Sequence, residues 1–273
     1  MRIDPNKHPA YIIGFAAIAS GLFTAGIMAL HVATEPIVKA NQRLLTEKAI
    51  VELFNLGQAE TMTPEQIAEL IRRRVAGLED PDRSDPAARP ITISDPGTGR
   101  SMRLLVAYKS DMPAGAEVDI HDKQNVLGYA FPIRGVGFWA MIDGWLAVQP
   151  DGQKALGVVF LSHQETPGLG GRITEEVFRK QFAGLDVSQP KQGMEYVQID
   201  RDKPQPGSPE AARHVDAITG ATGTSTAVGT FINKGFVEFR QIAQAAGLLE
   251  AGEASKPQTQ GAETQETQPH TQP

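Results

Sequence analysis

Residues 216–225 read DAITGATGTS, a run of small and hydroxyl-bearing residues just before an apolar helical pattern. Ser and Thr are favoured helix N-caps and Gly is common in the preceding turn, so ordinary capping is one interpretation of the run. A second is an anion site, because the first N–H groups of a helix have no partner inside it and its dipole is positive there. Thr222 and Thr224 stand at that position, while Gly220 and Ala221 keep the backbone open to a phosphate-bearing group. A threonine hydroxyl is a weak nucleophile without a base and no base is evident, so attaching a group here would require a separate enzyme.

The loop SHQETPGLGG at 162–171 follows an apolar, strand-like run and is the second candidate for chemistry. Its Pro and three Gly are typical of a tight connector. Glu165 and Thr166 at its entrance and Leu169 at its tip favour another use, a pocket that holds a flat, partly apolar ligand and satisfies its polar edge. His163 is close enough in sequence to approach such a ligand, but a lone His in a loop is more often solvated, which is what we expect here.

Both tryptophans, Trp139 and Trp145, lie beside glycines in GVGFWAMIDGWLAV at 135–148. Large aromatic side chains usually pack in a core, and stacking on a ligand is the alternative for either of them. The sequence leaves this choice open.

Composition narrows the chemistry that the 273 residues can carry. The formal net charge of −6, without a basic stripe, argues against a nucleic-acid partner. The chain has no Cys, which excludes disulfides, cysteine-ligated zinc, iron–sulfur clusters and thiol catalysis. No GxGxxG motif follows a predicted strand, so we expect no nicotinamide site on this chain, and we expect no metal site.

The segment 11–33, YIIGFAAIASGLFTAGIMALHVA, contains no Asp, Glu, Lys or Arg. As a helix rising about 1.5 Å per residue, it is long enough for the roughly 30 Å hydrocarbon core of a bilayer. A cleaved signal peptide is the alternative, but the apolar stretch is long for one and no small-x-small cleavage site follows it. We therefore predict an uncleaved single-pass anchor, whose orientation the flanking charges leave open.

Two helical patterns follow the anchor. The first runs from Glu35 and stops at Gly57, a plausible C-cap. The second begins with Thr63 as N-cap, Pro64 at the first helical position and Gln66 where a capping box needs it. A Pro- and Asp-rich stretch at 80–99 then predicts an irregular loop.

From about residue 103 the pattern becomes β-like, with the runs RLLVAYK, NVLGYAFPI, GWLAVQ and ALGVVFL. The last two are joined by PDGQK, a hairpin-type turn. TEEVFRKQFAG predicts a helix, EYVQID a strand, and residues 224–249 a long closing helix. Strands that cluster in the sequence and are flanked by helices predict an α+β fold with a largely antiparallel sheet.

These patterns divide the chain into five parts. They are a short N-terminal tail (1–10), the anchor (11–33), a helical and loop connecting region (34–100), an α+β domain (101–248) and a C-terminal tail (249–273). The C-terminal tail lacks core-forming residues and is expected to be disordered.

The loop HQETPGLG at 163–170, followed by DAITGAT at 216–222, resembles the FMN-binding domain of the C subunit of the Na+-translocating NADH:quinone reductase. The G subunit of the related Rnf complex is similar. GVGFWAMIDGWLAV resembles the Gly-x-Gly-Leu-Trp segment of the quinone-reductase protein, with Phe138 in place of Leu. The resemblance covers roughly residues 1–248, and a single N-terminal anchor belongs to it.

In that family the signature Asp-x-x-Ser/Thr-Gly-Ala-Thr carries FMN, joined by a phosphoester to the hydroxyl of the last Thr. The resemblance therefore implies covalent FMN on Thr222, with Asp216 and Thr219 matching the start of the signature and Gly220 and Ala221 completing it. It also implies a set of residues around the flavin: Trp139, Glu165, Thr166, Gly168, Leu169, Gly170 and Thr224.

The function implied by the resemblance is electron transfer by a membrane-anchored redox subunit of an ion-translocating NADH:quinone reductase. The flavin supplies the redox chemistry, and the protein supplies its position and surroundings. NADH oxidation, the sodium path and ubiquinone chemistry would belong to other membrane subunits, and a flavin transferase with Mg2+ would attach the FMN, which makes the chain a phosphoprotein. The resemblance implies the inner membrane as its location, with the domain in the periplasm or at the cell exterior.

Two alternatives remain from the sequence. Within the same class, the chain is the G subunit of an Rnf complex or a stand-alone extracytoplasmic flavoprotein. Outside it, the chain is a non-redox, membrane-anchored binding or scaffold domain in which TGAT is only a helix start.

Overall fold

The computed structural model describes residues 9–80, 86–113, 115 and 117–250. Within them lie six strands of one sheet, a two-stranded parallel pair, four α-helices and several short 3-10 turns. The predicted N-terminal tail (1–10) and C-terminal tail (249–273) fall almost entirely outside the described residues.

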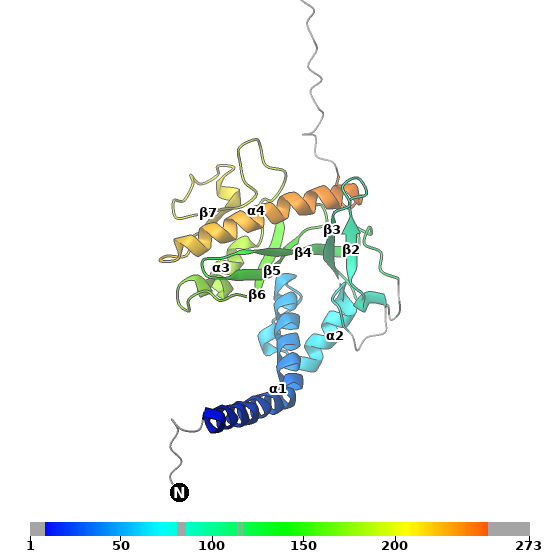
Figure 1. The fold of residues 1–273 in the computed structure, drawn as a ribbon. Helices are drawn as coiled ribbons and strands as arrows, with labels where there is room; N and C mark the ends of the chain where they lie inside the picture. The colour runs from blue at the N-terminus through cyan, green and yellow to red at the C-terminus, as the bar shows by residue number, and fades with distance from the viewer. Residues whose placement is uncertain (1–8, 81–85, 114, 116, 251–273) are drawn as a thin grey trace, which may run out of the picture.

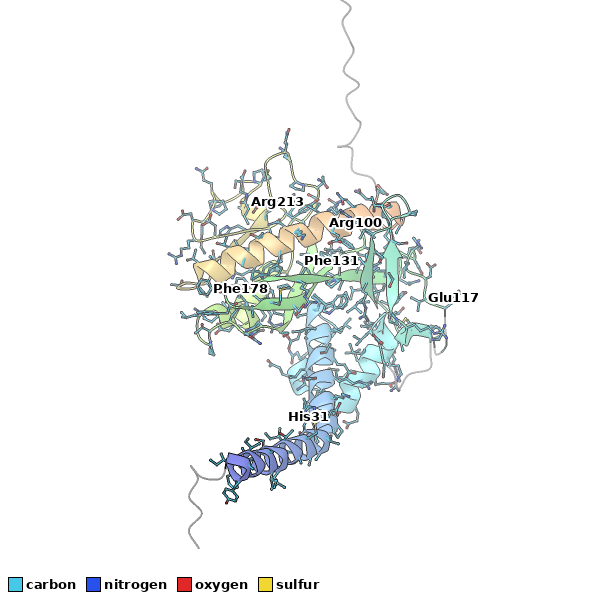
Figure 2. The ribbon with its side chains drawn as sticks, in the orientation of Figure 1. His31, Arg100, Glu117, Phe131, Phe178 and Arg213 are labelled. Atoms are coloured by element: carbon cyan, nitrogen blue, oxygen red, sulfur yellow. The ribbon has the colours of Figure 1, made fainter. Side chains whose placement is uncertain are left out.

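Helix α1 (Pro9–Leu53) is one continuous helix of 45 residues. It joins the predicted anchor (11–33) and the helical pattern that starts at Glu35, and it ends at Leu53, so the predicted C-cap at Gly57 was wrong. Pro36 lies inside it and cannot donate a backbone hydrogen bond to the preceding turn. A bend separates the N-terminal from the C-terminal part of α1 (Figure 1), and His31 lies close to that bend (Figure 2). A proline is a common cause of such a bend.

The N-terminal part of α1 is long and apolar enough to cross a membrane. Its large side chains, from Tyr11 to Val32, are exposed in the isolated chain. An apolar surface of this length without a protein partner is what a bilayer-spanning helix presents.

The main sheet is antiparallel throughout, with strand order β1-β3-β4-β5-β6 and β2 pairing with β3. The predicted α+β fold with a largely antiparallel sheet is confirmed. Its strands are β1 (Val75–Ala76), β2 (Ile91–Ser94), β3 (Ser101–Tyr108), β4 (Val126–Val136), β5 (Met141–Val148) and β6 (Ala155–Ser162). Strand β2 lies inside the stretch 80–99 that was predicted to be an irregular loop, so that prediction was wrong for ITIS, whose alternating residues pair with β3.

The two faces of the sheet carry separate cores, because successive side chains of a strand point to opposite faces. On one face, Phe131 of β4 stacks on Phe239 of α4 (Thr222–Ala245) with ring centroids 4.3 Å apart. On the other, Ala130 of β4 belongs to a cluster with Ile50 and Leu53 of α1. Helix α4 thus covers one face, while α1 and α2 lie against the other (Figure 1).

Helix α2 (Pro64–Arg74) begins as the sequence predicts. Thr63 is its N-cap, and Thr63 and Gln66 form both hydrogen bonds of a capping box. The helix passes directly into β1, which pairs with β3. The division of the chain at residue 100 stays a prediction, and strands β1 and β2 on its N-terminal side both pair with β3.

The segment between β6 and α4 is mostly irregular. The predicted helix at TEEVFRKQFAG is a short α3 (Glu176–Arg179) continued by a 3-10 turn, η5 (Lys180–Phe182). Strand β7 (Gln198–Asp200) pairs in parallel with β8 (His214–Asp216), just before α4. The other 3-10 turns are η2 (Ala59–Thr61), η3 (Pro86–Ala88), η4 (Gly170–Thr174) and η6 (Ala211–Arg213).

Candidate functional site

Three segments far apart in the sequence meet at one end of the sheet. They are the turn 137–140 that joins β4 to β5, the loop 163–169 that follows β6, and the first turn of α4. The turn is closed by a hydrogen bond from the Gly137 N–H to the Ala140 carbonyl, at 2.8 Å. Each segment contains one of the motifs that the sequence marks as a candidate.

The Glu165 carboxylate joins the three segments. Its Oε1 accepts hydrogen bonds from the backbone N–H groups of Phe138 and Trp139, at 2.9 and 3.1 Å. Its Oε2 accepts from the Thr224 hydroxyl at 2.6 Å. Only 4% of Glu165 is exposed, so the carboxylate is a buried, fully hydrogen-bonded centre that holds the turn and the loop against α4.

Glycines allow this close packing. A Cβ added at Gly170 would lie 2.5 Å from Thr224 Oγ1, and one added at Gly137 would lie 2.5 Å from Glu165 Oε1. Both distances are shorter than real Cβ contacts, so a larger residue at either position would displace Thr224 or Glu165. Gly168 has a φ of +75° at the exposed tip of the loop, a conformation that L side chains rarely adopt.

Trp139 and Leu169 present apolar surface beside this centre. Trp139 is 68% exposed, and its indole Nε1 donates to Thr166 Oγ1 at 3.1 Å. The Trp139 ring packs edge-to-face on Phe138, with centroids 5.1 Å apart. The Leu169 side chain, also exposed, lies next to Gly220, where an added Cβ would be 3.2 Å from it.

The structure separates the two tryptophans whose roles the sequence left open. Trp145 is partly buried and packs against the core under α1 and α2. Trp139 lies outside both cores, with its ring exposed at the junction of the three segments. His163, whose Nδ1 accepts from the Glu165 N–H at 3.2 Å, is half-buried in the loop rather than solvated.

Capping does not account for the hydroxyl groups at the start of α4. The N-cap is Ala221, and no side chain caps the helix. Ser225 Oγ accepts from the Ile218 N–H at 3.0 Å, upstream of the helix, and the Thr224 hydroxyl is bound to Glu165. Thr222, the first residue of α4, is exposed.

Arg201 contacts the exposed Thr222. Its Nη2 donates a hydrogen bond to Thr222 Oγ1 at 2.7 Å. Sequence reasoning missed this residue, because a single arginine in an irregular stretch carries no pattern. The nearest signal was the strand predicted at EYVQID, which ends at Asp200 directly before Arg201; its parallel pairing with β8 is what brings Arg201 to the start of α4.

Asp216 and Thr219 precede α4, and the hydrogen bonds of the described residues join neither of them to Thr222 Oγ1. The Asp216 carboxylate pairs with Lys203 Nζ at 2.9 Å and with His214 Nε2 at 3.2 Å. The hydrogen bond from Lys203, followed by that from His214, holds the pKa of Asp216 below its usual range. Thr219 is exposed in the turn before α4, beside Gly220, whose φ is +81°.

The arrangement suits a ligand with an anionic end and a flat, apolar end. The start of α4 offers unpaired N–H groups and has no acidic residue in its first turn, which favours an anion such as phosphate. Exposed side chains of Phe138, Trp139 and Leu169 offer apolar contact next to it. Among the described residues, no group of three or more His, Cys, Asp or Glu could hold a metal ion.

Comparison with known proteins agrees with this chemistry. Residues 137–236 match the FMN-binding domain family, a range that contains all three segments of the site. The C subunit of the Na(+)-translocating NADH-quinone reductase of Pseudomonas aeruginosa is 27% identical over 230 residues, covering 79% of this chain and 85% of that protein. The corresponding protein of Yersinia pestis is 29% identical over 208 residues, covering 70% and 75%.

A solved structure has the same fold. The crystal structure of Shewanella oneidensis NqrC aligns with a TM-score of 0.53 and 21% identity, over 77% of this chain and 98% of that one. Residues 137–236 thus match an FMN-binding domain, and over most of its length the chain is similar to C subunits of Na(+)-translocating NADH-quinone reductases.

Proposed function

We propose that this chain is a membrane-anchored electron-transfer subunit of a Na+-translocating NADH:quinone reductase, and that it carries FMN through a phosphoester on Thr222. The named relatives, each the C subunit of such a complex, support the assignment to the complex. The state of the Thr222 hydroxyl supports the covalent attachment.

One observation carries the proposal: of the three hydroxyl-bearing residues in the first turn of α4, Thr222 is the exposed one, and its hydroxyl bonds to Arg201 rather than to the core or the helix backbone. Thr224 and Ser225 are buried and bonded to Glu165 and to the Ile218 N–H. Thr222 is exposed, does not cap the helix, and lies where a phosphate is favoured. A covalent ester at Thr222 would disturb no internal hydrogen bond of the core.

The neighbouring residues fit the rest of FMN. Ala221 and Gly220 place little bulk beside the phosphate, and Gly168 and Gly170 shape the loop opposite. Trp139, Thr166 and Leu169 would hold the ring system. When bound, FMN supplies the electron transfer, and this chain supplies position, partial burial and nearby dipoles.

Attachment requires a second protein. A threonine hydroxyl needs a base to become a nucleophile, and among the described residues the group bonded to Thr222 Oγ1 is the cationic Arg201, which cannot act as one. We therefore propose that a separate flavin transferase, acting with Mg2+, takes the Thr222 proton and transfers the flavin phosphoryl group to Oγ1 from a donor in which that phosphate is bonded to a leaving group, which is released. The chain is then a phosphoprotein by virtue of its flavin.

The partners follow from what this chain lacks. NADH oxidation, the sodium path and ubiquinone chemistry belong, in this proposal, to the other membrane subunits. The apolar part of α1 anchors the domain at the inner membrane, with the domain outside the cytoplasm. Anchoring raises the effective concentration of the flavin near its redox partners.

The test is the mass of the intact chain made in a host that contains a flavin transferase. The wild-type chain should gain the mass of one FMN less one water and fluoresce in a denaturing gel. Thr222→Val should fold but lack both signals. Thr226→Val is the matched control, because Thr226 is an exposed threonine in the same first turns of α4, and it should keep the flavin.

Three results would count against the proposal. Added mass on Thr222→Val would mean that another hydroxyl is esterified. Loss of the mass in Thr226→Val as well would mean that the variants act through the helix rather than through the hydroxyl. A wild-type chain that never gains the mass would leave the scaffold interpretation standing.

A further inference from the structure

Arg201 is held in place beside the start of α4 by the strand pair that precedes it. In the parallel register of β7 and β8, Asp200 lies opposite Asp216, so the residues after both strands leave the same edge. Asp200 Oδ1 accepts hydrogen bonds from the N–H groups of Arg201 and Asp202, at 2.6 and 3.4 Å, which fixes the turn. The guanidinium of Arg201 then reaches Thr222 Oγ1 at 2.7 Å.

The charge of Arg201 is not neutralised by the protein around it. Within the described part of the chain, its guanidinium bonds to the neutral Thr222 hydroxyl and forms no ion pair with a carboxylate. The first turn of α4 contributes no acidic side chain either. The neighbouring cation, Lys203, is paired with Asp216 instead. The positively charged guanidinium of Arg201 and the positive end of the α4 dipole thus both face the Thr222 hydroxyl.

We propose that Arg201 is a phosphate-binding residue that pairs with the flavin phosphodiester on Thr222. The inference rests on the attachment proposed above. A phosphodiester carries one negative charge on its two non-bridging oxygens, and its phosphorus would be bonded to the Oγ1 that Arg201 already contacts. Arginine matches such oxygens with two parallel N–H donors, which a lysine ammonium cannot do.

The direct test is the phosphorus resonance of the attached flavin, recorded on the full chain in detergent after production with the transferase. Arg201→Gln should shift the 31P resonance of the folded protein away from the wild-type position. Arg201→Lys should give an intermediate position, since it keeps the charge but loses the paired donors. In denaturant all variants should give one resonance, because the contact exists only in the fold.

The matched control is Arg103→Gln. Arg103 is a partly exposed arginine on β3 that pairs with Glu79 at 3.5 Å, away from the start of α4. Its removal changes the net charge by the same amount and should leave the 31P resonance at the wild-type position. A shift of equal size in this control would overturn the local contact in favour of a general charge effect.

A second measurement compares the melting temperatures of flavin-bearing and flavin-free chains, the latter made in a host without the transferase. The rise in melting temperature on flavin attachment should be about 2 °C larger in wild type than in Arg201→Gln, which is the size expected of one partly exposed charge pair. That difference should shrink near 1 M salt, where the screening length is about 3 Å.

The outcomes separate this inference from the proposal on which it rests. If wild type carries the flavin mass but Arg201→Gln matches it in both 31P resonance and melting difference, Arg201 does not bind the phosphate and the attachment at Thr222 still stands. If wild type carries no flavin mass, the attachment itself fails, and the inference fails with it.

Discussion

Helices α2 and α4 both begin among hydroxyl side chains, yet they use them in opposite ways. At α2, the Thr63 side chain accepts from the Gln66 N–H at 3.3 Å, and the Gln66 side chain accepts from the Thr63 N–H at 2.9 Å. At α4, the N-cap is Ala221 and no side chain satisfies the first N–H groups. Helix α2 closes its own start, whereas α4 leaves its start open.

The charges at the two helix starts also differ: a negative side chain lies at α2 and a positive one at α4. Helix α2 carries Glu65 in its first turn, which offsets the positive end of its dipole. Helix α4 has no acid there, and Arg201 adds a positive charge beside it. The comparison teaches that threonines before a helix indicate capping only when one of them bonds to the helix backbone. Where none does, the start is available to an anion.

The largest expected effect concerns Glu165, which accepts the hydrogen bond of the Thr224 hydroxyl and so keeps that hydroxyl from capping α4. Glu165→Ala leaves that buried hydroxyl and two part-buried backbone N–H groups without their acceptor, and a buried unsatisfied group costs about 1–3 kcal/mol. We expect a loss of about 3 kcal/mol in the free energy of unfolding, measured with urea. The flavin should stay attached, with an altered absorbance spectrum or reduction potential.

The control for this prediction is Glu175→Ala. Glu175 is a partly exposed acid that pairs with Arg172 at 3.0 Å, and its loss should change the unfolding free energy by less than about 0.5 kcal/mol. Equal losses in the two variants would mean that the Glu165 centre does not hold the three segments together.

An effect of intermediate size tests the difference between the starts of α2 and α4 directly. Thr63→Val removes the cap of α2 and should lower the unfolding free energy by about 1 kcal/mol. Thr222→Val, measured in the flavin-free chain, removes an exposed hydroxyl without a capping bond and should change it by less than about 0.5 kcal/mol. If Thr222→Val cost as much as Thr63→Val, the hydroxyl of Thr222 would be structural and the contrast between the two starts would fail.

The smallest effect is the pH dependence of the α2 start. Backbone hydrogen bonding at Glu65 itself, and then the hydrogen bond with Thr63, hold the pKa of Glu65 below its ordinary value. A lowered pKa in the folded state means that the contribution is complete above the unfolded pKa and is lost as pH falls through the folded one. Wild type should therefore be slightly more stable than Glu65→Gln above about pH 5, and the two should converge in stronger acid. A difference that grows toward low pH would have the wrong sign.

Much of the fold was predictable because its signals are local. The capping box at Thr63 and Gln66 and the strand runs from β3 to β6 are fixed by residues close in sequence. The continuity of α1 was not predicted, since a proline inside a helix removes a backbone hydrogen bond, yet α1 continues through Pro36. Strand β2 was missed because its alternating ITIS pattern is only four residues long and stands between prolines in a stretch rich in turn residues.

The candidate site was predictable in part. The sequence marked Trp139, Glu165 and Thr224, and the structure brings them together. The sequence did not indicate that the Glu165 carboxylate accepts its hydrogen bonds from other parts of the protein, because these partners lie 26 to 59 residues away. Arg201 was missed, since the parallel pairing of β7 with β8 positions it and short parallel strands leave little trace in a sequence.

The most direct test of the open start of α4 is to locate the flavin within the wild-type chain. A digest of the transferase-treated protein, analysed by tandem mass spectrometry, should place one added FMN less one water on Thr222. Thr219, Thr224, Ser225 and Thr226 in the same peptide should be unmodified. The same mass on Thr224, whose hydroxyl is bound to buried Glu165, or on any other of these residues, would contradict the claim that Thr222 carries the flavin.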